Sequence, residues 1–173
     1  GVSIIPAEDG ELASGLNGEG RMAEPETIAT FVNDFISQSV VSNQTLLVTA
    51  GPTFEHIDPV RYIGNHSSGK MGFAIAKAAL AKGYKVHLIS GPTKEELVHP
   101  NLIRQDVITA NQMMEAVQSV WPSCDYGVFS AAVADYRPLS KSEEKIKKNK
   151  DVLDIKLTKN PDILSWASAS REK

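Results

Sequence analysis

Three small and polar residues, Ser67-Ser68-Gly69, have the types and the position needed to hold a phosphate group. They end a long polar loop and directly precede an alanine-rich segment, 71–82, with the composition of a helix. The loop itself follows an apolar run at 45–50 that is typical of a buried strand. Loops that join a strand to a helix N-terminus bind phosphates, because free backbone N–H groups and the positive end of the helix dipole converge there. The pattern predicts a phosphorylated ligand, most simply a nucleotide.

Two familiar phosphate loops do not fit this stretch. The spacing Gly64-x-x-x-x-Gly69-Lys70 matches a P-loop, but Met71 stands where a Ser or Thr would coordinate magnesium. The dinucleotide fingerprint G-x-G-x-x-G is also absent after the expected strands. An NAD(P)-dependent reductase of Rossmann type therefore stays an alternative that the missing glycines, and the lack of a Tyr-x-x-x-Lys pair, disfavour.

Composition indicates one soluble domain with a small appendage. The chain has 173 residues, of which 42% are apolar and 23% are charged. No apolar run approaches the roughly 20 residues that span a membrane, and no signal peptide is visible. The single cysteine, Cys124, excludes an intramolecular disulfide, and one Cys with four scattered His residues makes no Cys/His metal site. We expect a cytoplasmic protein.

Charge is distributed unevenly along the chain. Residues 1–43 hold seven acids and one base, a net charge of −6, whereas the remainder carries +3. A mildly basic part is what an anion-binding domain needs. The excess is too small for a nucleic-acid footprint, and no basic helix is present, so we expect no nucleic-acid partner.

The expected elements alternate between strand and helix after residue 44. The periodicity predicts strands at 45–50, 86–90, 102–107 and 126–132, and helices at 71–82 and 110–120, with Gly83 ending the first helix. Such alternation predicts a Rossmann-like, three-layer α/β domain with a parallel sheet. Ligands bind beyond the carboxyl edge of such sheets, where three strands end in small residues, Gly51, Gly91 and Ala131-Ala132.

The flanking segments have a different character. Residues 1–23 read as loop, and a helix is predicted from Pro25 to about Val41, so that 1–43 and 44–173 form separate units. A lysine-rich loop follows Ala134, then a half-exposed strand at 152–157, and then a short helix that Asn160-Pro161-Asp162 caps. We expect the chain to be a fragment of a longer protein at both ends.

Six separate blocks, in order, resemble phosphopantothenoylcysteine synthetase, which in bacteria is usually the C-terminal half of a bifunctional coenzyme A biosynthesis protein. The blocks are Gly51-Pro52-Thr53, 58–63 (Asp-Pro-Val-Arg-Tyr-Ile), 65–72 (Asn-His-Ser-Ser-Gly-Lys-Met-Gly), 131–136 (Ala-Ala-Val-Ala-Asp-Tyr), Lys145-Ile146-Lys147-Lys148 and Lys159-Asn160-Pro161-Asp162. Residues 15–25 are similar to the end of the flavin-dependent phosphopantothenoylcysteine decarboxylase half. Ser14 stands where that family usually has a proton-donating cysteine. FMN would belong to the upstream decarboxylase domain, outside this chain.

The resemblance implies a two-step ligation. CTP and 4′-phosphopantothenate would give an acyl-cytidylate and pyrophosphate, and the amine of L-cysteine would then attack the acyl carbon and release CMP. It also implies Mg²⁺, a homodimer formed through the synthetase domain and a higher oligomer of the full-length protein. CTP rather than ATP rests on the bacterial form of the motifs. A nucleotide-binding fragment without turnover remains a further alternative.

Roles for individual residues also follow from the resemblance. It implies that Asn65 binds the acyl intermediate, with Arg61 and Lys145 as further catalytic residues and His66 beside the substrate. It assigns the triphosphate to Lys145 on a mobile loop, and a magnesium–triphosphate complex or the ribose to Asp135. The remaining nucleotide-binding candidates are Gly51, Pro52, Thr53, Ser67, Ser68, Gly69, Ala131, Ala132, Asn160, Pro161 and Asp162. Plainer roles stay open: an Asx-turn for Asn65, a salt bridge for Arg61, and helix caps for Ser67, Ser68 and Asp162.

Overall fold

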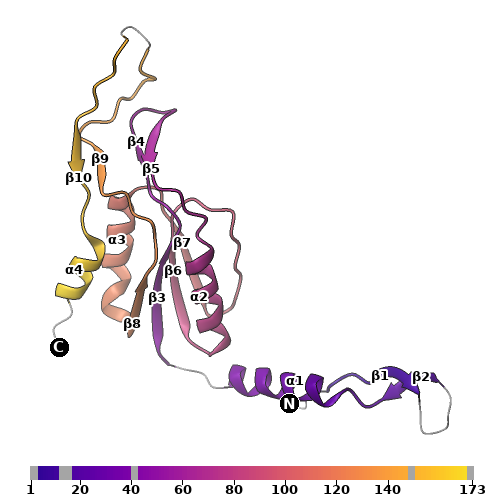
Figure 1. Ribbon diagram of the computed structural model, residues 1–173. Coiled ribbons are helices and arrows are strands. Elements are labelled where there is room, and N and C mark those ends of the chain that lie inside the picture. Colours follow the sequence, from indigo (N-terminus) through magenta and orange to yellow (C-terminus); the bar gives the residue numbers. More distant parts are fainter. Residues whose placement is uncertain (1–3, 12–16, 40–42, 148–150, 171–173) are drawn as a thin grey trace.

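A four-stranded parallel sheet forms the centre of the protein (Figure 1). The computed structural model describes residues 4–11, 17–39, 43–147 and 151–170. The strand order is β7 (Leu102–Asp106), β6 (Lys85–Ser90), β3 (Thr45–Ala50) and β8 (Tyr126–Phe129). All three neighbouring pairs are parallel. The predicted α/β class is confirmed.

Helices cover both faces of this sheet, as a three-layer fold requires. Leu46, Val48 and Ala50 of β3 pack with α2 (Lys70–Ala81) on one face. Leu47 points to the other face, where it joins a cluster with α3 (Ala110–Val120) and α4 (Ile163–Ala169). Because successive side chains of a strand point to opposite faces, the near-continuous apolar run of β3 supplies both cores. None of the helices in the described ranges is long and apolar enough to cross a membrane.

Local capping explains where these helices begin and end. Thr109 caps α3 through a capping box, in which its side chain accepts from Gln112 N and the Gln112 side chain accepts from Thr109 N. Asp162 caps α4 by accepting from Ser165 N at 2.8 Å. Gly83 follows α2 with φ of +83°, the left-handed conformation expected of a glycine after a helix.

A small antiparallel hairpin, β4 (Phe54–His56) with β5 (Tyr62–Gly64), stands at the carboxyl edge of the sheet, where the sequence predicts only loop. The rings of Phe54 and Tyr62 stack at 4.1 Å between centroids. The buried Glu55 side chain accepts from Ala110 N at 2.8 Å, which ties the hairpin to the start of α3. The hairpin therefore has a fixed place beside β9 (Tyr136–Pro138) (Figure 1).

The bounds of two predicted strands, 126–132 and 152–157, are wrong. The strand predicted at 126–132 ends at Phe129, and Ala132 makes only an isolated bridge with Pro52. The strand predicted at 152–157 is a mostly exposed, irregular stretch, and β10 (Leu157–Lys159) begins at its last residue. Only β10 meets the partner strand β9, and a strand without a ladder of hydrogen bonds is not stable.

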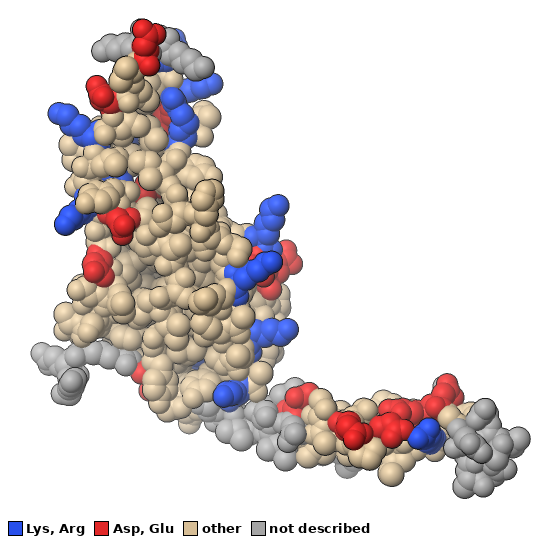
Figure 2. Space-filling model, viewed as in Figure 1, with Lys and Arg blue, Asp and Glu red and all other residues tan. Residues whose placement is uncertain are grey.

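The prediction of loop at 1–23 is wrong for residues 8–11 and 17–21, and residues 1–3 and 12–16 lie outside the described residues. Strands β1 (Glu8–Glu11) and β2 (Asn17–Arg21) form an antiparallel hairpin, and α1 (Pro25–Ser39) follows, beginning at Pro25 as predicted. Residues 40–42, where this helix was predicted to end, lie outside the described residues. The hairpin and α1 project from the sheet (Figure 1) and carry an acidic surface (Figure 2). The domain boundary at 43 stays a prediction.

The loops after β3 and β6 approach too closely for any side chain at Gly91. A Cβ atom on Gly91 would lie 1.6 Å from the carbonyl oxygen of Pro52. We expect Gly91→Ala to lower the free energy of unfolding by about 3 kcal/mol, at the upper end of overpacking costs, because the obstacle is backbone. Urea unfolding followed by circular dichroism measures this change.

Gly10→Ala is the matched control for that substitution. A Cβ on Gly10 would meet only the Arg21 side chain, at 2.7 Å from its Cδ, and that side chain can move. We expect a change within about 1 kcal/mol. Equal effects of the two substitutions would show that the close approach at Gly91 does not constrain the fold.

Candidate functional site

The candidate site lies at the carboxyl edge of the sheet, where the loops after β3, β6 and β8 meet. Gly91 N donates to Ala50 O at 2.9 Å, and Ala132 N donates to Gly51 O at 2.8 Å. Thr93 Oγ1 donates to Ser68 O at 2.6 Å and so ties the loop before α2 to the same place. The structure therefore brings together the loops that carry Gly51-Pro52-Thr53, Ser67-Ser68-Gly69 and Ala131-Ala132.

The N-terminus of α2 is open at this edge. Its N-cap residue is Gly69, which has φ of +79°, and no side chain caps the helix. Ser67 and Ser68 accept only long bonds, from Gly69 N at 3.3 Å and from Lys70 N at 3.4 Å. Both hydroxyl groups and the first-turn N–H groups can therefore face an anion. The role of Ser67-Ser68-Gly69 as a phosphate cradle stays a prediction, and this geometry is compatible with it.

A cavity of about 630 Å³ adjoins this edge, between the end of β8 and the start of α4. Its volume falls in the range of ordinary small-molecule sites. Of the predicted nucleotide-binding residues, Ala131, Asp135, Asn160, Pro161 and Asp162 line it. Asn65, Ser67, Ser68, Gly69 and Lys145 are not among its lining residues.

The two acidic side chains of this cavity, Asp135 and Asp162, differ in their hydrogen bonding. Asp162 is occupied in capping α4, which is the plainer role that the sequence left open. Asp135 is exposed, and within the described ranges its carboxylate makes no hydrogen bond or ion pair. The described residues contain no cluster of three or more His, Cys, Asp or Glu side chains that could cage a metal ion. A single free carboxylate does fit Mg²⁺ bound to a nucleotide, because that ion is commonly held by one or two carboxylates plus phosphate oxygens.

Asn160 is held rigidly at the wall of the cavity. Its Nδ2 donates to Ala134 O at 2.7 Å, and its Oδ1 accepts from Arg137 Nη1 at 3.0 Å. Arg137 Nη1 also donates to Lys159 O at 2.6 Å. Sequence reasoning missed Arg137, although an arginine two residues beyond Asp135 at a ligand edge is a usable signal. Arg137 fixes which way the Asn160 amide points.

Asn65 and Thr53 connect neighbouring loops. Asn65 Nδ2 donates to Val133 O at 3.0 Å, and the residue is otherwise exposed. Thr53 is fully buried, and its Oγ1 accepts from Ala134 N at 3.0 Å. Thr53 therefore belongs to the scaffold, and its own N–H donates to Ala132 O at 3.3 Å. His66 is exposed at the same loop.

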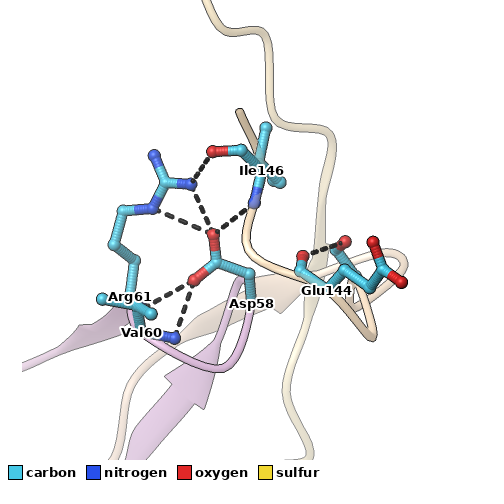
Figure 3. A network of polar contacts seen from close by, with 6 residues as sticks. Asp58, Val60, Arg61, Glu144 and Ile146 are labelled. Carbon is cyan, nitrogen blue, oxygen red and sulfur yellow. Dashed lines mark hydrogen bonds and ion pairs between the residues drawn. The ribbon is translucent and has the colours of Figure 1, made fainter. Parts of the chain in front are cut away.

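Arg61 forms the ion pair that the sequence left open as its plainer role (Figure 3). Its guanidinium binds the carboxylate of Asp58 through Nε, at 3.0 Å, and through Nη2. The Asp58 side chain is fully buried, whereas that of Arg61 is 40% exposed. Arg61 can therefore still meet a ligand. Sequence reasoning missed Asp58, although an Asp-Pro pair signals an Asx-turn at a hairpin tip.

The Asp58 carboxyl group stays ionised at all ordinary pH values. The guanidinium of Arg61 lowers the pKa of Asp58 far below 3.8, and backbone N–H groups of Val60, Ile146 and Arg61 act in the same direction. Burial raises this pKa, but by less. A buried carboxylate at this place is thus stable only because donors surround it.

Lys145 lies away from the cavity, next to this ion pair. It is exposed, and the following residue, Ile146, binds both Asp58 and Arg61 through its backbone. Residues 148–150 of the lysine-rich loop, whose mobility the sequence predicts, lie outside the described residues. Lys145 and the cavity thus occupy two parts of the carboxyl-edge region.

Comparison with known proteins gives a consistent picture. The family "DNA/pantothenate metabolism flavoprotein C-terminal domain" matches residues 41–173. The coenzyme A biosynthesis bifunctional protein CoaBC of Haemophilus influenzae is 48% identical over 95% of this chain, which spans 41% of that relative's length. A crystal structure of the C-terminal domain of such a CoaBC protein aligns with a TM-score of 0.66 and 38% identity, over 77% of this chain and 62% of the other. The DNA/pantothenate metabolism flavoprotein of Streptococcus pneumoniae aligns with a TM-score of 0.65 and 30% identity, over 74% and 65%.

We expect Arg137→Ala to lower the free energy of unfolding by about 1–2 kcal/mol, because two charge-assisted bonds are lost, and to loosen the Asn160 amide, which keeps only its bond to Ala134 O. The ¹⁵N–¹H resonances of the Asn160 side chain measure the second effect. Arg104→Ala is the control, because Arg104 also donates to a backbone carbonyl, that of Glu95, but lies over Phe73 and away from Asn160. An unchanged Asn160 signal in Arg137→Ala would contradict the positioning of that amide.

The ion pair of Asp58 predicts a pH dependence of stability with a definite sign. Because the folded-state pKa is depressed, the stabilisation is fully present above the unfolded-state value of 3.8 and is lost as the pH falls toward the folded-state pKa. The difference in unfolding free energy between wild type and Asp58→Asn should be constant from about pH 7 to 5 and shrink below about pH 4. Urea titrations across this range measure it, and a difference that grew on acidification would refute the assignment.

Proposed function

The chain belongs to the DNA/pantothenate metabolism flavoprotein C-terminal domain family, and from this premise we propose that it joins L-cysteine to 4′-phosphopantothenate in coenzyme A biosynthesis, using CTP. The similarity to bifunctional coenzyme A biosynthesis proteins supports the pathway. The observation that carries the proposal is the cavity of about 630 Å³ at the carboxyl edge, with the free Asp135 carboxylate on its wall. Nucleotides bind in this position in parallel α/β sheets.

The nucleotide is assigned to the cavity and to the open N-terminus of α2. Cavity residues Ala131, Asp135 and Asn160 would contact the base and the ribose, and Ser67-Ser68-Gly69 would receive phosphate oxygens. The amide of Asn160, fixed by Arg137, offers one remaining donor and one remaining acceptor position. Asp135 would hold Mg²⁺ together with phosphate oxygens. When bound, that ion would neutralise part of the negative charge of the triphosphate.

The first chemical step makes an activated acyl group. A carboxylate oxygen of 4′-phosphopantothenate attacks the α-phosphorus of CTP, and the bond to pyrophosphate breaks. Lys145 is proposed to neutralise negative charge on the triphosphate as this bond breaks. Its ammonium is available for that role, because it makes no ion pair with an acid among the described residues.

The second step forms the amide. The cysteine amine attacks the acyl carbon and releases one proton to water, and CMP leaves with the electrons of the broken bond. Asn65 keeps one N–H and its carbonyl oxygen for the acyl group, since only one N–H is used on Val133 O. Arg61, which is part-exposed beside Asp58, is proposed as the partner of the substrate's phosphate.

Calorimetric titration of the chain with CTP, with ATP and with NADPH tests this proposal. Mg²⁺ is present in the CTP and ATP titrations. We expect selective CTP binding, weakened roughly tenfold by Lys145→Ala and by Asp135→Asn, because in the proposed complex each substitution would remove a charge that binds the triphosphate or its cation. Lys85→Ala is the matched control, because it removes the same charge at the start of β6, on the opposite edge of the sheet.

Three outcomes would count against the proposal. Binding of NADPH instead would favour the reductase alternative, and equal binding of ATP and CTP would remove the choice of nucleotide. If the folded chain bound CTP without forming product from 4′-phosphopantothenate and L-cysteine, it would act as a nucleotide-binding unit only.

A further inference from the structure

A buried carboxylate that the proposed chemistry does not use sits at the tip of the β4–β5 hairpin. Asp58 is fully buried and accepts from five donors: Val60 N, Arg61 N, Arg61 Nε, Arg61 Nη2 and Ile146 N. The two carboxylate oxygens of Asp58 accept from different donors. Oδ1 accepts from Val60 N and Arg61 N, both at 2.8 Å, and so closes the hairpin turn. Oδ2 binds the guanidinium and reaches across to Ile146 N at 3.1 Å.

Both backbone polar groups of Ile146 are hydrogen-bonded to the Asp58–Arg61 ion pair (Figure 3). These two bonds are called the grip on Ile146 below. Its N–H donates to Asp58 Oδ2, and its carbonyl oxygen accepts from Arg61 Nη2 at 2.9 Å. These bonds join residues 88 and 85 positions apart in the sequence. The N–H and the C=O of Ile146 are therefore both hydrogen-bonded, as those of a strand in a sheet are, although here the partners are two side chains.

The gripped residue stands between two exposed lysines, Lys145 and Lys147. The surrounding chain has little other support. Ser142 N donates to Ile57 O at 2.9 Å, and residues 143–147 and 151–156 contain no helix or strand. Asp58 and Arg61 neutralise one another, so their pair holds the segment without competing for the lysine side chains.

We propose that Asp58 is a positioning residue that holds Lys145 for the nucleotide, acting through Arg61 and the backbone of Ile146. This inference rests on the proposed function, in which Lys145 meets the triphosphate. Ordering an irregular segment costs conformational entropy, and a segment that is already restrained loses less of it when the ligand binds. Asp58 itself touches neither substrate nor nucleotide.

The sharpest variant is Asp58→Asn. An asparagine keeps one oxygen, which can still accept from Val60 N and Arg61 N, but its amide nitrogen replaces Oδ2 and cannot accept from Ile146 N or from the guanidinium. The variant therefore removes the grip and retains the turn. Asp106→Asn is the control, because Asp106 also pairs with an arginine, Arg104, at 2.9 Å, and in the described part of the chain it is not bonded to Lys145, Ile146 or Lys147.

Ile146→Pro provides a second variant if Asp58→Asn does not fold. Proline removes the N–H of Ile146 and leaves the pair of Asp58 and Arg61 in place. Leu153→Pro is its control, because Leu153 lies in the exposed, irregular stretch further along the segment and is not bonded to Asp58 or Arg61.

Two measurements test the proposal on these proteins. Without nucleotide, amide hydrogen exchange at Ile146 should accelerate roughly tenfold in Asp58→Asn, while exchange of β3 amides stays unchanged. With CTP and Mg²⁺, affinity should fall roughly tenfold in Asp58→Asn and in Ile146→Pro, and the KM for CTP should rise more than kcat falls. Asp106→Asn and Leu153→Pro should behave as wild type.

The outcomes separate the positioning role from the proposed function. Unchanged exchange at Ile146 in Asp58→Asn would overturn the grip itself. Faster exchange with unchanged CTP affinity, in a protein whose Lys145→Ala variant binds CTP weakly, would overturn the positioning role and leave the function standing. If the wild-type chain did not bind CTP, both the function and the positioning role would fail, and the exchange data would still show whether the grip exists.

Discussion

The close approach of two backbone turns at the carboxyl edge of the sheet is the constraint on which the site depends. Gly91 lies against the carbonyl of Pro52, and Gly51, with φ of +74°, lies against both Gly91 and Gly69. No side chain fits between them, so the loops after β3 and β6 and the loop before α2 converge on one spot. The open N-terminus of α2 and the cavity beside β8 are both placed by this convergence, since the Gly51 carbonyl also binds the loop after β8.

Polar side chains then fix the loops to one another. Thr53 binds Ala134 N, Asn65 binds Val133 O, Asn160 binds Ala134 O, and Asp58 binds Ile146 N. Each of these contacts joins a side chain to the main chain of a distant segment, and each satisfies a backbone group that a loop would otherwise leave to water. Asn65 and Asn160, which have a proposed role in ligand binding, therefore also hold the edge together, so their substitution affects both binding and order.

The parts of the fold that the sequence predicted are those with an apolar pattern. The run Leu46-Leu47-Val48 indicated a strand buried on both faces, and the bounds of β3 and α3 are as predicted. The β1–β2 and β4–β5 hairpins could not be predicted in the same way, because Glu8–Glu11 and Phe54–His56 gain their order from pairing and not from burial of an alternating face. Within the site, Asp135 and Asn160 were found at one cavity, but Asp58 and Arg137 were missed, since their importance comes from partners far along the chain.

The grip on Ile146 acts on main-chain atoms alone, so the length of the chain between Ile146 and β10 can vary. Asp58 and Arg61 bind an N–H and a C=O that every residue except proline possesses, so the grip does not depend on the side chain at position 146. The strand β10 is likewise registered by its own ladder with β9. The stretch of chain between these two fixed points can therefore gain or lose residues at little entropic cost, since the closure entropy of a loop changes slowly with its length. Insertions and deletions among homologous chains should accordingly concentrate between Lys147 and β10, leaving the spacing from Asp58 to Arg61 untouched.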